Sequence, residues 1–451
     1  MSSSKSASVI TLTFNPPATR WLLLLPAILV LLCAWFAVRW YVGDTLAEYA
    51  PAPDDGGSEL AEMAVRWAPD DPLTHWRLAN FEMRDFSAAN INAAVEQYRL
   101  AVKASPYDFR YWVELGRALE ASGDRDSAEK ALRRAVELAP SYSYPQWHLG
   151  NVLLRQGKVD EAFTHLTRAA ATDNAMQPPV FALSEQVYGN DINAITRVLP
   201  TPALRMQFAL NLVNTNRFDE AARVLRVISD ADQKTHSDIG DQIMQALLVK
   251  KQYRAALSIL REIEPDTGQL PVLGQVWNGG FENDVPLLDP KPFRWQINSR
   301  PQTQISLDTL AHSGSRSLRI IFRAAARLDS IPASQTVIVE PDTNYRLQFY
   351  QRTEKLASGS APFVTINDEV FGGPLAASPP APAGTNDWQQ VTLEFKTRAQ
   401  GDGIAITFTR GNCGEPKEIC PIFGTVWYDD FNLQRIGSPG ASGRSAGTNN
   451  R

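Results

Sequence analysis

The chain has 451 residues, of which 44% are hydrophobic and 21% are charged, and its formal net charge at pH 7 is -5. A chain of this composition can bury large cores, so it is not a disordered protein, and its length predicts about two or three domains. The acidic balance offers no general attraction for nucleic acid, and we expect no nucleic-acid partner.

The first element is an apolar segment, WLLLLPAILVLLCAWFAV, which occupies residues 21–38 and holds no charged residue. It is long enough to cross a bilayer, and Arg39, Trp40 and Tyr41 extend it with residues typical of the membrane interface. We therefore predict a transmembrane helix over 21–43. A cleaved signal peptide and a buried helix are the alternatives. The long polar lead, and the lack of a small-residue cleavage site soon after the segment, favour a retained anchor.

Lys5 and Arg20 precede the helix, and the positive-inside rule then places a tail of residues 1–20 in the cytoplasm. The bulk of the chain would be extracytoplasmic, as in a single-pass protein of the cell membrane. Residues 44–58, which include APAPDDGGS, are predicted to form a linker.

A repeat follows the linker. The segments 111–140 and 145–173 share six residues at a spacing of 34: Gly116, Leu119, Gly123, Ala128, Leu132 and Ala135 recur as Gly150, Leu153, Gly157, Ala162, Leu166 and Ala169. This pattern resembles the tetratricopeptide repeat family, which implies stacked helix hairpins. Small residues let two helices approach, and the large ones fill the next groove. Weaker units over 205–228 and 239–263 extend the predicted repeat domain to 59–265, with 59–69 as a capping helix.

The resemblance implies a concave surface, made by the first helix of each hairpin, that binds protein partners. The residues expected to face inward are basic, aromatic or amide-bearing: Arg77, Phe81, Arg110, Arg117, Tyr144, Trp147, Asn151 and Arg155. Arginines that pair with carboxylates, beside rings that supply contact area, predict a groove for an extended acidic peptide. The alternative is a solvated face that packs within the chain.

From Val272 the hydrophobic period changes from helical spacing to two. Tyr345, Leu347 and Phe349 alternate with polar residues, and later segments repeat the alternation. About ten such strands predict an all-β antiparallel sandwich or jelly roll over 271–436. The stretch WNGGFEND, residues 277–284, opens this domain. We expect the tail 437–451 to be disordered. The predicted fold class is thus an α+β multidomain chain: a transmembrane helix, a helical solenoid and a jelly roll.

The order of short motifs in the β domain narrows this prediction. NGGFE, FRW, HSGSRSLRI, YRLQFYQR, DWQQVTLEF and VWYDDFNL follow one another between residues 278 and 433. This order resembles the carbohydrate-binding modules of families four and nine, within the galactose-binding-like jelly rolls. The resemblance implies a noncatalytic glycan-binding module with a structural calcium. Glu282 and Asp430 match its acidic ligand places, and Asp308 is a possible third ligand. Asp430 could instead cap a turn.

A glycan would contact the outer face of the strand YRLQFYQR. If Tyr345, Leu347 and Phe349 fill the core, then Gln348, Tyr350 and Arg352 point outward. A planar ring beside amide and guanidinium donors suits a sugar. The chain departs from the family in having no clear row of exposed aromatic residues, and the fold alone does not prove sugar binding.

Cys413 and Cys420 lie in one short loop, RGNCGEPKEICPIFG, far from Cys33. On an extracytoplasmic side they are predicted to form a disulfide.

The sequence contains no HExxH, GxSxG or P-loop motif. Asp429 and Asp430, adjacent on a strand, are expected to point to opposite faces, which is poor geometry for glycoside hydrolysis. We therefore expect no enzyme. The combined prediction is a membrane-anchored accessory scaffold in envelope or exported polysaccharide assembly, with protein partners on its repeats and a polysaccharide on its β domain. The alternative is a pure protein-interaction scaffold whose β domain binds no sugar.

Overall fold

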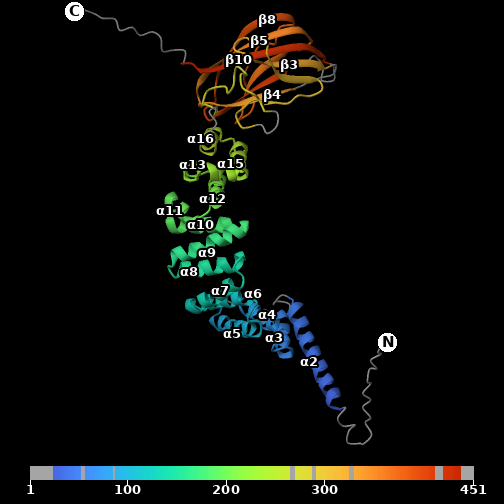
Figure 1. Ribbon diagram of the computed structural model, residues 1–451, viewed down its shortest axis with the longest axis vertical. Coiled ribbons are helices and arrows are strands. Elements are labelled where there is room, and N and C mark those ends of the chain that lie inside the picture. The colour runs from blue at the N-terminus through green and yellow to red at the C-terminus, as the bar shows by residue number, and fades with distance from the viewer. Residues whose placement is uncertain are drawn as a thin grey trace, which may run out of the picture. The chain divides into compact units, whose positions relative to one another are not determined.

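The computed structural model describes residues 24–51, 56–84, 87–264, 270–286, 291–324, 330–411 and 420–437. Within them, helices α2 to α16 precede strands β1 to β10, as the fold class predicted (Figure 1). The chain divides into two compact units, residues 1–198 and 199–451. The predicted boundary between repeats and β domain lay near residue 270, so the last helices belong to the same unit as the strands.

Helix α2, Leu24–Glu48, extends beyond the predicted transmembrane segment into the expected linker. Its end packs on α3, Gly57–Trp67. Gly43 has no room for a side chain, because a Cβ there would lie 2.4 Å from the Cβ of Ala68. Arg39 Nε donates to the carbonyl oxygen of Trp67 at 2.5 Å, at the end of α3 where carbonyl groups lack helical partners. The predicted capping helix is therefore paired with the end of the apolar helix.

Three helix hairpins form the well-defined repeats. They are α4 (Pro72–Glu82) with α5 (Ala88–Ala104), α6 (Phe109–Ala121) with α7 (Arg125–Leu138), and α8 (Ser143–Arg155) with α9 (Val159–Thr172). The same contact between a glycine of the first helix and a leucine of the second helix occurs in two of the hairpins. A Cβ on Gly116 would lie 2.5 Å from Leu132 Cγ, and a Cβ on Gly150 would lie 2.7 Å from Leu166 Cγ. The small-large pattern read from the sequence is therefore the packing of each hairpin.

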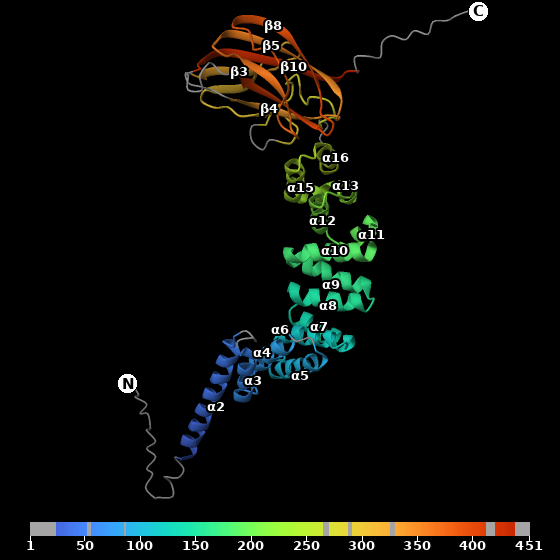
Figure 2. The ribbon, with the colours of Figure 1, turned by 180° about the vertical axis from the view of Figure 1, so that it is seen from behind.

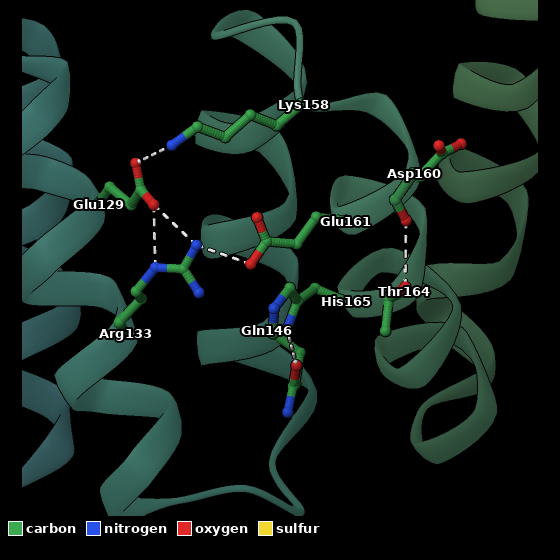
Figure 3. Close-up of polar contacts among 8 residues, drawn as sticks. All are labelled: Glu129, Arg133, Gln146, Lys158, Asp160, Glu161, Thr164 and His165. Atoms are coloured by element: carbon green, nitrogen blue, oxygen red, sulfur yellow. Dashed lines mark hydrogen bonds and ion pairs between the residues drawn. The ribbon is translucent and has the colours of Figure 1, made fainter.

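Ion pairs join consecutive repeats along their second helices (Figure 3). Arg133 of α7 donates to Glu129 of the same helix at 2.7 Å and to Glu161 of α9 at 2.6 Å. Lys158 donates to the other oxygen of Glu129 at 2.7 Å. Burial would raise the pKa of Glu129, but the hydrogen bonds from Lys158 and Arg133 hold it below its ordinary value. Polar contacts thus supplement the apolar core between repeats.

The remaining helices are less regular. Unit 1 ends with η3 (Asn174–Met176), α10 (Gln177–Tyr188) and α11 (Ile192–Val198). Unit 2 begins with α12 (Pro202–Asn214), α13 (Phe218–Arg226), α14 (Asp230–Thr235), α15 (Ser237–Val249) and α16 (Tyr253–Ile263). The pairs α12 with α13 and α15 with α16 are the two weaker predicted units, and α14 lies between them.

The last helix contacts the β domain directly. The Tyr253 ring occupies the space beside Gly403, where a Cβ would lie 2.5 Å from the ring. The backbone N–H of Arg254 donates to Asp402 Oδ2 at 3.0 Å, and Lys251 Nζ donates to the carbonyl of Val370 at 2.7 Å. These contacts join α16 to the β domain within one compact unit.

The β domain is a sandwich of two antiparallel five-stranded sheets. The first sheet has the order β1-β4-β9-β6-β7, and the second has the order β2-β3-β10-β5-β8 (Figures 1 and 2). The strands are β1 Gln296–Ile297, β2 Thr303–Asp308, β3 Ser317–Ala324, β4 Ser330–Ile338, β5 Asn344–Ser358, β6 Pro362–Asp368, β7 Pro374–Ala377, β8 Gly384–Lys396, β9 Gly403–Arg410 and β10 Ile422–Arg435. Tyr345, Leu347 and Phe349 are buried in the core, as their alternation predicted.

The opening stretch WNGGFEND packs against the closing strand. Phe431 N–H donates to the Gly279 carbonyl at 2.9 Å. Phe281 is fully buried, with its ring 5.1 Å from that of Trp295 and 6.1 Å from that of Phe431. A Cβ on Gly279 would lie 2.1 Å from the carbonyl oxygen of Phe431. Gly279 therefore lets the opening stretch lie directly on the backbone of β10, near its end.

Replacing Gly279 by Ala should destabilise the β domain by about 1 to 3 kcal/mol, because the new methyl group must displace rigid backbone. Gly280→Ala is the matched control, since the nearest atom to its Cβ would be 3.5 Å away. Urea unfolding of both variants, followed by aromatic circular dichroism, measures the difference. Equal stability of the two variants would contradict the close contact between the opening stretch and β10.

Candidate functional site

Residues 309–316, between β2 and β3, form a loop held by carboxylates; we call it the clasped loop. Glu282 Oε1 accepts from the backbone N–H of Ser315 at 2.8 Å and of Arg316 at 3.1 Å, and its Oε2 accepts from Ser315 Oγ at 2.6 Å. These hydrogen bonds, chiefly that from Ser315 Oγ, lower the pKa of Glu282. Gly314 has φ +68°, and a Cβ there would lie 2.3 Å from Glu282 Oε1. A side chain at position 314 would therefore be strained by its backbone angle and would crowd the carboxylate of Glu282.

Two carboxylates of β10 hold the other end of the clasped loop. Asp429 Oδ2 accepts from the backbone N–H of His312 at 2.8 Å and of Ser313 at 3.3 Å. Asp430 binds the same two residues through their side chains, His312 Nδ1 and Ser313 Oγ, both at 2.7 Å. Burial raises the pKa of Asp429 to about 6, against the opposing hydrogen bond from His312.

The expectation that Asp429 and Asp430 point to opposite faces is wrong. The pairing of β10 with β5 shifts between Asp429 and Asn432, and Asp430 has φ 53°. Such a bulge breaks the regular alternation of side chains. Both carboxylates therefore reach one loop, and Asp430 points toward the outer face of the second sheet.

The clasped loop places His312 over Tyr350 of β5. The two rings stack with centroids 3.5 Å apart and planes inclined by 13°, and the His312 ring meets Trp388 of β8 edge-on at 5.8 Å. Sequence reasoning identified Tyr350 but missed His312. The residue stands inside the motif HSGSRSLRI, yet only the folded loop brings it to β5. One face of the predicted sugar-binding ring is consequently covered.

Next to Tyr350 lies a cavity of about 440 Å³, which we call the polar hollow. The described residues that line it come from the opening stretch, the clasped loop and three strands: Gly279, Gly280, Ser313, Gln348, Tyr350, Gln390, Asp430, Phe431 and Asn432. Two of the three predicted glycan contacts, Gln348 and Tyr350, are in this set. Arg352 is not, and its Nη1 donates to Asp387 instead, at 3.1 Å.

The strand register explains the residues that sequence reasoning missed. Gln348 lies between Thr392 and Asn432, and Tyr350 lies between Gln390 and Asp429. Because cross-strand neighbours share a face, the side chains of three strands converge. Three amides, two hydroxyl groups and one carboxylate line the hollow, one of the hydroxyl groups on the Tyr350 ring, and these groups can exchange paired hydrogen bonds with a polyhydroxylated ligand.

The three predicted calcium ligands do not come together. Asp308 Oδ2 accepts from Trp427 Nε1 and from Arg319 Nη1, each at 2.9 Å. Burial would raise the pKa of Asp308, but these two partners hold it below its ordinary value. Glu282 and Asp430 bind the clasped loop instead. In the part of the chain that the structure describes, no group of three or more His, Cys, Asp or Glu side chains is placed to hold a metal ion. Glu282 and Asp430 thus reach the same loop, whereas Asp308 binds Trp427 and Arg319 elsewhere, and a calcium ion held by Glu282 and Asp430 stays a prediction.

The repeats of unit 1 carry a second cavity, of about 490 Å³, which we call the repeat groove. Its lining residues are Met83, Arg117, Glu120, Ala121, Arg125, Trp147, His148, Asn151 and Arg155. Four predicted partner contacts are in this set: Arg117, Trp147, Asn151 and Arg155. His148 was missed, and its pKa is lowered to about 4, first by burial and then by the two nearby arginines. It is neutral at pH 7.

Three of the predicted contact arginines already have carboxylate partners. Arg117 pairs with Glu114 at 2.7 Å, and Arg110 pairs with Asp108 at 2.5 Å. Arg155 pairs with Glu120. The surface is thus less basic than the sequence pattern suggested, because acidic residues one repeat away or nearby in the chain compensate it.

The other predicted contacts lie outside the repeat groove. Arg110 and Tyr144 line a neighbouring cavity of about 380 Å³ together with Leu73, Trp76, Phe109, Tyr111, Glu114 and Tyr142. Arg77 lies over the Phe81 ring at 5.2 Å and donates to the carbonyl of Ala50. Arg77 and Phe81 thus support the start of the array in this structure.

Two further predictions concern the membrane and the cysteines. Among the described residues, α2 is the one helix long and apolar enough to cross a membrane, a test that a signal sequence would also pass. Cys420 is disulfide-bonded and Cys33 is a free, exposed thiol. Cys413 lies outside the described residues, so its pairing with Cys420 stays a prediction.

Residues 83–143 and 113–176 match a family model described as tetratricopeptide repeat. A search of curated proteins finds no match. A solved structure described as "CBM4 structure and function" is 14% identical with a TM-score of 0.27, and the match covers 36% of this chain and 99% of that chain. A MamA structure from Desulfovibrio magneticus RS-1 is 19% identical with a TM-score of 0.27, and covers 30% of this chain and 75% of its own.

A second structure, described as a crystal structure of MamA protein, is 16% identical with a TM-score of 0.27, and the match covers 48% of this chain and 94% of that chain. Structural similarity at TM-scores this low supports no assignment of fold or function. The family model and the helix hairpins agree over α5 to α9. This chain therefore contains tetratricopeptide repeats, which support a role as a protein-interaction scaffold.

Proposed function

We propose that the chain is a membrane-anchored scaffold that binds protein partners through its repeats and a glycan in its polar hollow, in the assembly of envelope or exported polysaccharide. The observation that carries the glycan assignment is the convergence of Gln348, Gln390 and Asn432 beside Tyr350. The order of the β-domain motifs, which resembles glycan-binding modules, supports the same assignment.

The chemistry of the hollow suits sugar hydroxyl groups. A primary amide can donate and accept at once, and a carboxylate can accept from two adjacent hydroxyl groups. Gln390 is exposed on its strand, so its amide is accessible to a ligand. Small-molecule sites combine an apolar or aromatic surface with a few fixed polar groups, and here Tyr350 supplies the ring while three strands and the clasped loop supply the polar groups. A hollow of this polarity is a poor match for an apolar protein anchor, which disfavours the alternative of a purely protein-binding β domain.

The membrane anchor is supported by the way in which α2 ends. Gly43 and Ala47 are buried, whereas the preceding apolar residues Leu24 to Val38 are exposed. The end of the helix thus packs with α3 while its first part has no protein partner among the described residues. Cleavage within α2 would expose the small-residue face of α3. A retained anchor keeps this face covered.

Protein partners are assigned to the repeat groove, where Trp147 is half-buried among polar residues. Because Arg117 and Arg155 pair with glutamates of the array, an acidic partner would compete with these existing pairs. The ring therefore provides most of the expected binding free energy, and the arginines provide orientation.

The glycan assignment predicts the behaviour of two adjacent glutamines. Gln390→Ala should weaken glycan binding about threefold to tenfold, since it removes about one net hydrogen bond, with little change in melting temperature. Gln389→Ala, an equally exposed neighbour that does not line the hollow, is the control. Titration of the full-length protein in detergent with a panel of cell-surface polysaccharides measures both. If the wild-type protein binds none of the panel, the glycan assignment is wrong.

The repeat groove predicts a hot spot. Trp147→Ala should weaken partner binding by about 2 kcal/mol without loss of helical content. Tyr107→Ala removes a ring that is 80% exposed and lies outside the groove, and it should retain the partners. Quantitative mass spectrometry of proteins co-purified from the native membrane compares the two variants. Equal recovery with both variants, or unfolding of Trp147→Ala, would rule out Trp147 as a binding anchor.

The anchor prediction concerns the mature chain. Protein extracted from its native membrane should retain α2 by intact mass measurement, and alkaline carbonate should not release it, because an 18-residue apolar segment stays in the bilayer. A mature chain that begins after Glu48 and is released by carbonate would instead identify a cleaved signal sequence.

A further inference from the structure

A row of three large residues crosses the outer face of the second sheet beside the polar hollow. Trp427 of β10 is paired in register with Arg352 of β5 on one side and with Arg319 of β3 on the other. Tyr350 and Asp429 form the next row, two residues along the same strands. Successive rows on one face are about 7 Å apart, so the arginine row lies about one sugar unit beyond the hollow.

The two arginines differ in how firmly they are held. Arg319 donates through Nη1 to Asp308 at 2.9 Å and through Nη2 to Ser306 at 3.3 Å. Arg352 donates through Nη1 to Asp387 at 3.1 Å, and that carboxylate side chain is 86% exposed. The Nε atoms of Arg352 and Arg319 are both buried without a hydrogen-bond partner, so the two arginines differ in their ion pairs and not in this donor. An exposed ion pair such as that of Arg352 with Asp387 contributes little to stability, and an unsatisfied buried donor costs free energy. A ligand that offers Arg352 a better acceptor can therefore replace Asp387 at little cost.

We propose that Arg352 binds a carboxylate of the glycan, and that the ligand of the β domain is therefore an acidic, uronic-acid-containing polysaccharide. This inference rests on the proposed glycan function of the polar hollow. A ligand carboxylate replaces the exposed Asp387 and accepts two parallel hydrogen bonds from the guanidinium fork, the strongest geometry available to arginine.

The charges on the face position the acidic sugar. Asp430 is the charged member of the described residues that line the hollow, and it disfavours a carboxylate there. The carboxylate is attracted instead to the row of Arg352 and Arg319. A glycan can fit both rows if one sugar places its hydroxyl groups in the hollow beside Tyr350 and the next sugar places its carboxylate at Arg352. A uniformly neutral glycan offers no carboxylate, so Arg352 keeps its ion pair with Asp387.

The test compares one set of oligosaccharides before and after chemical removal of its charge. Oligogalacturonate and oligomannuronate are titrated into the full-length protein in detergent, beside their carboxyl-reduced neutral forms. We expect the acidic form of at least one of the two sugars to bind about tenfold or more tightly than its reduced form, with an affinity that falls as salt rises. Arg352→Gln should remove this preference.

Arg346→Gln is the matched control for charge. Arg346 lies on the same strand and face, but its Nε and Nη2 both donate to Glu394, at 2.9 and 2.7 Å. This variant should keep the preference for the acidic sugar. If wild type binds the acidic and reduced forms equally, the acidic-ligand inference is wrong while the glycan function stands. If wild type binds none of these sugars but binds another neutral glycan, the inference also fails, and if it binds no glycan at all, both fail.

Discussion

The candidate site depends on the hydrogen bonds by which three carboxylates hold the loop 309–316 in place. Glu282 comes from the opening stretch of the β domain, whereas Asp429 and Asp430 come from its closing strand, and together they accept at least seven hydrogen bonds from this loop. The loop carries His312 onto Tyr350 and completes one wall of the polar hollow. Backbone donors bound to a carboxylate fix a loop, and the hydrogen bonds from His312 and Ser313 offset part of the cost of burying Asp429.

Much of the fold could be predicted, because its packing is periodic. The Gly116 and Leu132 contact returns as Gly150 and Leu166, and the alternation at Tyr345 to Phe349 is buried as expected. The site was predicted only in part. Gln348 and Tyr350 follow from alternation on one strand, but Gln390 and Asn432 depend on the register between strands, which local pattern does not contain. The bulge at Asp430, with its positive φ, reversed the expected direction of a carboxylate.

The charged residues were the least predictable from the sequence. Arg117 and Arg155 were correctly placed in a groove, yet their partners Glu114 and Glu120 could not be assigned before the helices were stacked. Arg352 points to the expected face but lies outside the hollow, and Asp308 accepts hydrogen bonds from Trp427 and Arg319. A side chain's type suggests its chemistry, whereas its nearest opposite charge decides whether that chemistry is available to a ligand. The end of α2 is a similar case, since its pairing with α3 depends on Gly43.

The central claim is that the clasped loop and the outer face of the second sheet form one glycan site. Hydrogen exchange of the full-length protein, with and without a polysaccharide that binds in titration, tests it most directly. The account predicts slower exchange at residues 348–352 of β5, 429–432 of β10 and 312–316 of the loop, with little change in the first sheet. Protection confined to the first sheet or to the helices, with unchanged exchange in the loop, would contradict it.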